Sequence, residues 1–320
     1  MKRFLFRVKQ FFLQVKRLFN WRTITDIAKR QEWPLRLADR LGRGHGRMRL
    51  LDTLTEPPPA PLKPDLTGWE NESLAAVWIG HATVLLRVGG KTILTDPVLS
   101  NRIGLGMGLF TLGPRRHMRP ALTIHELPPI DLVLLSHAHF DHLDLPTLAR
   151  LSKRITVIAA AGVSDLVGNL GFREVIELRW GETTRIADLR ITAKPVVHWG
   201  ARTFRDTHRG YCAFLIESQQ HRVLYGADTA YHEQWRGTAK VDLAILGIGA
   251  YDPYVAAHAT PEQALAMADH VGADSILPIH HSTFTLSREP RYEPIKRLLD
   301  AVGGDNKRVV IRRIGESFEK

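Results

Sequence analysis

From residue 74 onward the chain repeats short apolar runs that are rich in Val, Ile and Leu and bounded by Gly, Asp or Pro. Such runs predict β-strands. In order they are AAVWIG, TVLLRV, KTILTDP, IDLVLLS, ITVIAA, RITAKPVVHW, CAFLIES, HRVLYGAD, VDLAILGI, SILPIH and RVVIRRI. Helical stretches stand between some of them, as in LDLPTLARLS, GVSDLVGNLG and TPEQALAMADHVG, the last of which begins at the N-cap candidate Thr260. The pattern predicts an α/β or α+β fold, and two sheets with helices outside them would suit it.

The first 22 residues follow a different period. At about 100° per residue, their apolar side chains gather on one helix face, and the segment holds seven basic residues and no acid. The apolar face holds Phe4, Val8, Phe11, Phe12, Val15, Leu18 and Phe19, the polar face holds Lys2, Arg7, Lys9, Gln10, Gln14, Lys16 and Arg17, and Phe6, Leu13 and Trp21 break the pattern. Residues 1–22 are therefore predicted to form a basic amphipathic helix, typical of helices that lie on a membrane surface.

Other interpretations of residues 1–22 have different requirements. A transmembrane helix needs about 20 mostly apolar residues, and the charges at Arg7, Lys9, Lys16 and Arg17 exclude it. A secretory signal needs an uninterrupted apolar stretch of about 7–15 residues, whereas the longest uncharged run, from Gln10 to Val15, contains two glutamines. Docking of the aromatic face on the protein itself or on a partner, and a processed targeting segment, stay open beside the membrane surface.

The segment after this helix is a predicted connector, residues 23–69. Its first part is rich in Arg, and its second part, residues 51–68, contains five prolines and is expected to be extended. We therefore place the start of the folded domain near residue 70, so that the domain covers residues 70–320.

The charge of the chain is concentrated at its beginning. The 320 residues carry a formal net charge of +11, and the first 50 residues, with fourteen Lys and Arg against three acids, account for all of it. The predicted domain is therefore neutral, and we expect no nucleic-acid partner, because nucleic-acid binders usually carry a basic patch on the folded domain. Cys212 is the one cysteine, which excludes a disulfide scaffold.

A cluster of titratable residues directly follows a predicted strand. In DLVLLSHAHFDHLD, the run that ends at Ser136 is followed by His137, His139, Asp141 and His142. These groups would repel one another or shift their pKa when buried, and a divalent metal resolves this by binding neutral imidazoles and a carboxylate. One structural zinc with four ligands needs fewer groups in so short a stretch, so Asp141 and His142 are candidates for a second metal. Further ligand candidates at strand ends are His198, Asp228 and His280.

The ordered set resembles the metallo-β-lactamase-fold hydrolases, whose motif is H-x-H-x-D-H, a later His, a bridging Asp and a final His. Here the matches are HAHFDH, His198 in PVVHWG, Asp228 in GADTAY and His280 in PIHHSTF. Within that superfamily, roughly residues 70–320 are similar to the N-acyl-phosphatidylethanolamine-hydrolysing phospholipase D family. The closer match is carried by WIGHATVLL, LTDPVLSNR, GPRRHMRPALTIHELPPIDLVLLSHAHFDHLD, GIGAYDP and IHHSTF.

The resemblance implies an αββα sandwich with two zinc ions at one edge. It implies that one zinc is bound by His137, His139 and His198, the other by Asp141, His142 and His280, and both by Asp228. It also implies Asp141, Asp228 and His258 as catalytic residues, and Asp96 and His81 as residues that support the ligands. His280 is preferred to the adjacent His281 because the family has its histidine directly after the Ile of this motif, although an exchange of the two stays open.

The activity that the resemblance implies is cleavage of N-acyl-phosphatidylethanolamine-like phospholipids by a hydroxide that bridges the two metals. An apolar stretch beside basic residues suits a lipid with a phosphate, so Arg115, Arg116 and His117 are expected to bind substrate. The partners would be a phospholipid and, through residues 1–22, an anionic membrane surface. The expected location is cytoplasmic, peripheral on the inner face of the membrane.

Two other functions compete with this one. One is another hydrolase of the same fold, such as a lactonase or a soluble phosphodiesterase, and the other is a non-catalytic, membrane-associated binding protein. The complete ligand set argues against the second. Antibiotic hydrolysis is disfavoured, because the commonest subclass of β-lactamases uses a cysteine ligand and Cys212 lies at no ligand position.

Overall fold

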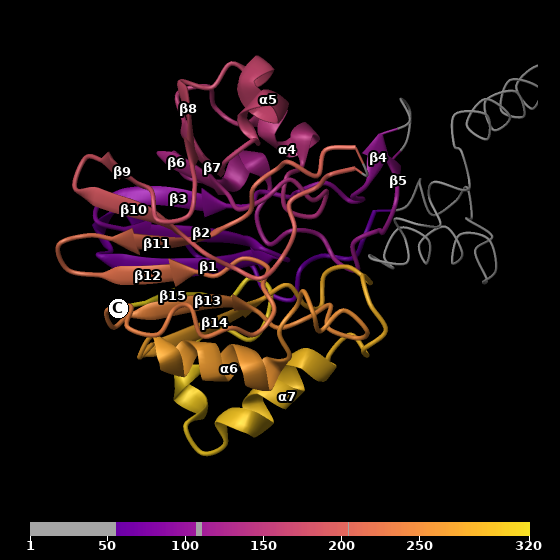
Figure 1. The fold of residues 1–320 in the computed structure, drawn as a ribbon, viewed down its shortest axis with the longest axis vertical. Coiled ribbons are helices and arrows are strands. Elements are labelled where there is room, and N and C mark those ends of the chain that lie inside the picture. The colour runs from indigo at the N-terminus through magenta and orange to yellow at the C-terminus, as the bar shows by residue number, and fades with distance from the viewer. Residues whose placement is uncertain (1–55, 107–110, 204) are drawn as a thin grey trace, which may run out of the picture. The chain divides into compact units, whose positions relative to one another are not determined.

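The computed structural model describes residues 56–106, 111–203 and 205–320 (Figure 1). The predicted amphipathic helix of residues 1–22 and the connector up to residue 55 lie outside the described residues. The part of the connector that is described, from residue 56 to 69, lies along the folded domain. Pro57 is buried, Leu66 packs against the core, and the carbonyl oxygen of Pro58 accepts a hydrogen bond from the Arg119 N–H at 2.8 Å.

The first sheet has seven strands in the order β15-β1-β2-β3-β6-β7-β8. The strands β1, β2, β3 and β15 pair antiparallel, whereas β3, β6, β7 and β8 run parallel. Their bounds are β1 Leu74–Gly80, β2 Thr83–Val88, β3 Lys91–Thr95, β6 Leu132–Leu135, β7 Thr156–Ala160, β8 Glu174–Leu178 and β15 Ser317–Glu319.

The second sheet has six strands in the order β14-β13-β12-β11-β10-β9. The strands β12, β13 and β14 run parallel, and the others pair antiparallel. Their bounds are β9 Thr183–Ile186, β10 Leu189–Lys194, β11 Ala213–Glu217, β12 Arg222–Tyr225, β13 Leu243–Gly247 and β14 Ser275–Ile279, and a separate small ribbon pairs β4 Leu105–Gly106 with β5 Thr111–Leu112.

Helices cover the outer faces of both sheets. Figure 1 shows α4 and α5 beside the first sheet and α6 and α7 beside the second, which is the expected αββα layering. The α-helices are α4 Leu145–Arg150, α5 Ser164–Val167, α6 Pro261–His270 and α7 Glu293–Val302, and the 3₁₀ turns are η2 Trp69–Asn71, η3 Ile124–Glu126, η4 Gly168–Leu170 and η5 Asn306–Arg308. Thr260 caps α6 as predicted, because its side chain accepts a hydrogen bond from the Gln263 N–H. None of the described helices is long and apolar enough to cross a membrane.

The main core lies between the two sheets. It joins side chains of the first sheet, such as Leu85 and Ile93, to side chains of the second, such as Phe214 and Tyr225, and all four are fully buried. Each such side chain contributes roughly 1.5–3 kcal/mol relative to an exposed one. A second core, which includes Leu224, lies between the second sheet and the helices α6 and α7.

Two of the strands predicted from the sequence differ from those in the structure. The run RITAKPVVHW is a strand only to Lys194, because Pro195 has no N–H to donate to a neighbouring strand. The run RVVIRRI is not a strand. It begins in η5 and touches β14 through one isolated bridge between Ile276 and Val309, while the edge of the first sheet is formed by β15.

Candidate metal centre

The predicted ligands meet at one edge of the sandwich, where parallel strands end. The strand β6 leads to Ser136 and the loop that carries His137 to His142, β12 leads to Asp228, and β14 leads to His280. Because the carboxyl ends of parallel strands lie at the same edge of a sheet, these side chains converge from distant parts of the sequence. His198 reaches the same place from the segment after β10.

Three histidines form the first group, which we call the histidine group: His137, His139 and His198. The Nδ1 atom of His139 lies 2.9 Å from Nε2 of His137 and 3.3 Å from Nε2 of His198. Burial, together with the neighbouring imidazoles, holds the pKa of His137 well below its usual value, and burial lowers the pKa of His139 to about 4. Neutral ring nitrogens therefore face one another at this point.

The second group, which we call the mixed group, contains Asp141, His142 and His280. The Oδ2 atom of Asp141 lies 3.3 Å from Nε2 of His280 and 3.7 Å from Nε2 of His142. Burial lowers the pKa of both histidines, but Asp228 and Asp141 outweigh it, so the pKa of His142 is raised well above its usual value and that of His280 to about 9. The carboxylates thus stabilise the protonated rings.

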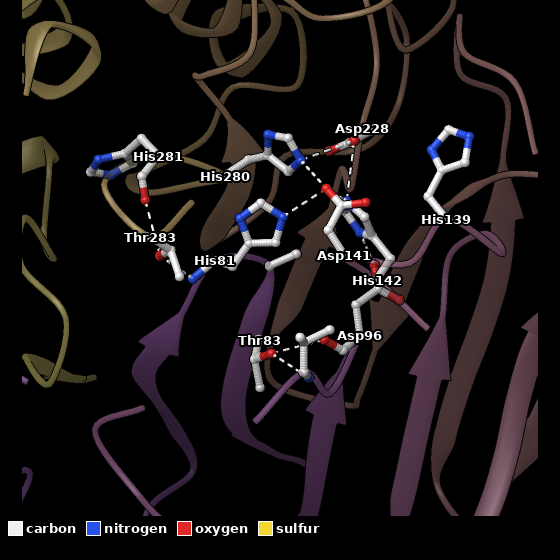
Figure 2. A network of polar contacts seen from close by, with 12 residues as sticks. His81, Thr83, Asp96, His139, Asp141, His142, Asp228, His280, His281 and Thr283 are labelled. Carbon is white, nitrogen blue, oxygen red and sulfur yellow. Dashed lines mark hydrogen bonds and ion pairs between the residues drawn. The ribbon is translucent and has the colours of Figure 1, made fainter. Parts of the chain in front are cut away.

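Asp228 lies between the two groups. Its Oδ2 atom is 3.1 Å from Nε2 of both His142 and His280, 3.8 Å from Nε2 of His198 and 4.0 Å from Nε2 of His137. Figure 2 shows its carboxylate above that of Asp141, with the His280 ring directed at both. Burial alone would raise the pKa of Asp228, but His142, His280 and His258 hold it well below the usual value. One carboxylate oxygen is therefore shared by both groups.

The outer ring nitrogens of three histidines are held by protein groups. The Nδ1–H of His198 donates to the Ala257 carbonyl oxygen at 3.0 Å, and that of His142 donates to Oδ2 of Asp96 at 2.7 Å. The Nδ1 atom of His137 lies 2.9 Å from the Ser136 hydroxyl, which itself donates to Asp96. These contacts orient each ring so that its Nε2 atom faces the centre, where it would bind a metal.

The residues fit a divalent metal. The Oδ1 atom of Asp228 is buried and has no hydrogen-bond partner among the described residues, a situation that is costly for a polar atom. Imidazole and carboxylate are the donors that zinc and similar ions take. One ring nitrogen from each residue of the histidine group lies within 4.8 Å of the others, and the same holds for one ligand atom from each residue of the mixed group and from His81.

The structure also places the residues that were expected around the ligands. Asp96 contacts His142 directly, and His81 donates from Nε2 to Oδ2 of Asp141 at 3.0 Å. His258 faces the shared carboxylate, with Nδ1 at 3.7 Å from Oδ2 of Asp228. His281 is buried and directed away from the carboxylates (Figure 2). The centroid of its ring lies 4.6 Å from that of Trp78, and its Nδ1 atom contacts the Ser282 hydroxyl. Of the adjacent pair, His280 is the one that faces the carboxylates.

The expected substrate residues have different environments. Arg116 is buried, and its guanidinium donates to the carbonyl oxygens of Ser100 and Val98 at 3.0 and 2.7 Å. The expectation that Arg116 binds substrate is therefore corrected, because the residue ties backbone segments together beneath the surface. His117 is half-buried, with Nε2 at 2.9 Å from the Thr285 hydroxyl, and Arg115 is also half-buried.

Three supporting residues escaped the sequence analysis. Tyr225 donates its hydroxyl to Asp96 at 2.6 Å, and Ser136 links Asp96 to His137. Arg202 donates to the carbonyl oxygens of Ala138 and Leu143 and so braces the loop that carries four of the ligands. These residues lie in or next to apolar strands or in an irregular loop, and no sequence pattern there indicates their role.

The Beta-lactamase superfamily domain matches residues 91–281, a range that includes all seven ligand candidates, from His137 to His280. The chain belongs to the beta-lactamase superfamily. An uncharacterized protein of Mycobacterium tuberculosis is 30% identical over 274 residues, covering 82% of this chain and 73% of its own length. N-acyl-phosphatidylethanolamine-hydrolyzing phospholipase D 1 of Caenorhabditis elegans is 30% identical over 256 residues, covering 71% and 70%.

Solved structures show the same superfamily fold. A possible metal-dependent hydrolase from Veillonella parvula superposes with a TM-score of 0.62 at 17% identity, covering 78% of this chain and 100% of that one. The metallo-β-lactamase fold predicted from the sequence is thus confirmed. Family, fold and the converging His and Asp side chains together make this chain a metal-dependent hydrolase.

Proposed function

We propose that this superfamily member is a phospholipase D-type hydrolase that cleaves N-acyl-phosphatidylethanolamine-like phospholipids with two zinc ions. The observation that carries the proposal is the position of Asp228, whose Oδ2 atom lies within 4.0 Å of histidines from both groups. A shared carboxylate between two sets of nitrogen ligands is what a pair of metal ions requires. The named relative from Caenorhabditis elegans supports the choice of substrate.

The histidine group would hold one zinc ion, the mixed group the other, and Asp228 both. Bound there, the ions would activate water near neutral pH and polarise a phosphoryl oxygen. Asp96 keeps His142 oriented, and His81 keeps Asp141 oriented, because each holds its neighbour by a buried hydrogen bond. Asp228 and Asp141 are the carboxylates that can take up a proton at the reaction centre.

His258 is proposed to contact the substrate. Burial lowers its pKa to about 4, so its ring is neutral at physiological pH and can donate or accept a hydrogen bond. It lies 3.7 Å from the shared carboxylate and is not fully enclosed, with 11% of its side chain exposed. This position suits a group that hydrogen-bonds the phosphodiester or the leaving alcohol.

The lipid surface is proposed to be reached through residues 1–22. Their seven basic residues and apolar face would bind an anionic leaflet, where each basic residue contributes on the order of 1 kcal/mol. This would place the protein on the cytoplasmic, inner face of the membrane, with the metal centre next to its substrate.

The test is a hydrolysis assay on liposomes with the full chain and with a variant that lacks residues 1–22. The panel holds N-acyl-phosphatidylethanolamine, phosphatidylethanolamine and phosphatidylcholine, with soluble esters and a lactone beside it, and metal content is measured by atomic spectroscopy. We expect two zinc ions per chain, release of N-acylethanolamine, and weaker liposome binding by the truncated chain.

Other outcomes point elsewhere. Turnover of soluble esters without lipid turnover favours a lactonase or a soluble phosphodiesterase. A metal-loaded protein that is inert on the whole panel favours a non-catalytic binding protein. If the truncated chain binds liposomes as well as the full chain, the membrane role of residues 1–22 is wrong, whereas the metal centre is unaffected.

A further inference from the structure

We propose that the pocket beside His280 binds an anionic oxygen group, a phosphate or a carboxylate, which accepts a hydrogen bond from the outer nitrogen of His280. The proposal rests on the proposed function in one respect, namely that His280 binds a metal through Nε2. It adds a second recognition site next to the metal centre, lined in part by Arg291.

His280 differs from the other histidines whose Nε2 atoms point inward. The Nδ1 atoms of His137, His142 and His198 are held by Ser136, Asp96 and Ala257 respectively. The Nδ1 atom of His280 is buried and has no hydrogen-bond partner among the described residues, although the side chain is only 1% exposed. The protein itself therefore leaves one ligand without the usual support on its outer side.

The chemistry of that nitrogen is determined by the metal. The Nε2 atom of His280 faces Asp141 and Asp228 at 3.3 and 3.1 Å, so it is the atom that would bind a metal. A neutral imidazole that binds through Nε2 carries its proton on Nδ1. The free position beside His280 therefore calls for a hydrogen-bond acceptor, and a buried donor without one is unfavourable.

A pocket lies against this residue. Its cavity has a volume of about 50 Å³ and opens to solvent, and its lining includes His280, Ser282, Thr285 and Arg291. Arg291 donates from Nε to the Ser282 carbonyl oxygen at 3.2 Å, and its terminal amino groups have no hydrogen-bond partner in the described part of the chain. A guanidinium with free amino groups is a strong receptor for phosphate and carboxylate oxygens.

Most of the other polar groups of the pocket already have partners, whereas the buried Nε2 atom of His281 has none among the described residues. The Glu289 carboxylate accepts from the N–H groups of Ala250 and Asp252 at 2.6 and 3.1 Å and from the Ser287 hydroxyl, so both of its oxygens are used to hold the backbone. His117 contacts Thr285 at 2.9 Å. The unused groups are thus His280 Nδ1 and Arg291, which are donors, and Nε2 of His281. Metal ions on the far side of His280 would add positive charge.

Two sources could supply the anionic group. It could be a second charged group of the substrate, such as the carboxylate of a serine headgroup, which would make the pocket a determinant of headgroup specificity. It could equally be a free phosphate or carboxylate, which would make the pocket a site of activation. In both cases the oxygen completes the hydrogen bonding of His280, so the recognition chemistry is the same.

The first arm of the test measures binding. Inorganic phosphate and acetate are titrated into the metal-loaded full chain labelled with ¹⁵N-histidine, for the wild type, Arg291→Gln, Arg291→Lys and the control Arg288→Gln. Arg288 is an exposed arginine three positions away that does not line the pocket. We expect a downfield shift of the His280 Nδ1–H proton on binding, at least tenfold weaker binding by Arg291→Gln, partial recovery by Arg291→Lys, and no change in Arg288→Gln.

The second arm distinguishes the sources. The ratio of kcat/KM for N-acyl-phosphatidylserine to that for N-acyl-phosphatidylethanolamine is measured in liposomes, with and without added phosphate. If the group belongs to the substrate, Arg291→Gln lowers this ratio about tenfold. If it is a free anion, added phosphate raises kcat on N-acyl-phosphatidylethanolamine in the wild type and not in Arg291→Gln.

The proposal is overturned if Arg291→Gln matches Arg288→Gln in anion binding, in the His280 proton shift and in the substrate ratio. Thermal unfolding of each variant verifies that the fold is retained. If the wild type binds the anions but hydrolyses no phospholipid, the proposed function fails while the pocket is supported, so the two failures can be told apart.

Discussion

The histidine group and the mixed group lie on either side of Asp228, and they differ in how their charges are balanced. In the histidine group, burial lowers the pKa of each ring, so three neutral imidazoles crowd together with nitrogens 2.9 and 3.3 Å apart. In the mixed group, carboxylates stand between the rings, and the pKa of His142 and of His280 is raised. The first group offers ready lone pairs, whereas the second is an ionic network that holds protons.

This difference predicts how each group takes up a metal. A cation entering the histidine group finds neutral ligands, whereas a cation entering the mixed group replaces protons. The two groups also differ in the residues that orient their histidine rings. The histidine group is oriented by Ser136 and the Ala257 carbonyl, whereas the mixed group depends on Asp96 and, at His280, on no protein group in the described residues.

The largest effect is expected at the residue that the two groups share. Asp228→Asn removes the carboxylate charge from both groups. Turnover should therefore fall by more than the roughly 100-fold that loss of a supporting residue costs. Less metal should bind at each group, and the fold should be retained. Steady-state kinetics and metal analysis measure this, with the exposed Asp300→Asn as control. Retained activity in Asp228→Asn would falsify the assignment of Asp228 as the shared ligand.

A smaller effect separates the supports of the two groups. Asp96 orients His142 directly and His137 through Ser136, so Asp96→Asn should weaken metal binding about 10–100-fold in both groups. Ser136→Ala should weaken the histidine group alone, because His142 keeps its contact with Asp96. Titration with a chromophoric chelator resolves the two affinities. Equal losses at both groups in Ser136→Ala would show that Ser136 does not support the histidine group specifically.

The smallest effect is a difference in pH dependence. The pKa of His280 is raised to about 9 in the metal-free protein, because the carboxylates outweigh burial, whereas that of His139 is lowered to about 4. Protons therefore compete with metal in the mixed group below pH 9, and its affinity should rise as pH rises from 7 to 9. The affinity of the histidine group should stay nearly constant over this range. Calorimetry in buffers of different ionisation enthalpy counts the protons released, and equal release from both groups would contradict the comparison.

Much of this centre could be foreseen from the sequence because its information is local. The spacing of HAHFDH places four ligand candidates directly after a strand, and the apolar runs that precede His198, Asp228 and His280 mark further strand or segment ends. Errors arose where local patterns are ambiguous. RVVIRRI has the composition of a strand but lies where only an isolated bridge forms, and Arg116 looks like a surface cation although its guanidinium is buried under two backbone carbonyls.

The sequence by itself thus determined the family, the layered fold and the identity of the ligand candidates, because strand periodicity and motif spacing are properties of neighbouring residues. Only the tertiary structure decided which oxygen of Asp228 lies between the two groups and that Tyr225 and Ser136 converge on Asp96. It also decided that the Nδ1 atom of His280 has no hydrogen-bond partner among the described residues. These relations join residues far apart in the chain, and they exist only where parallel strands from two sheets end at one edge.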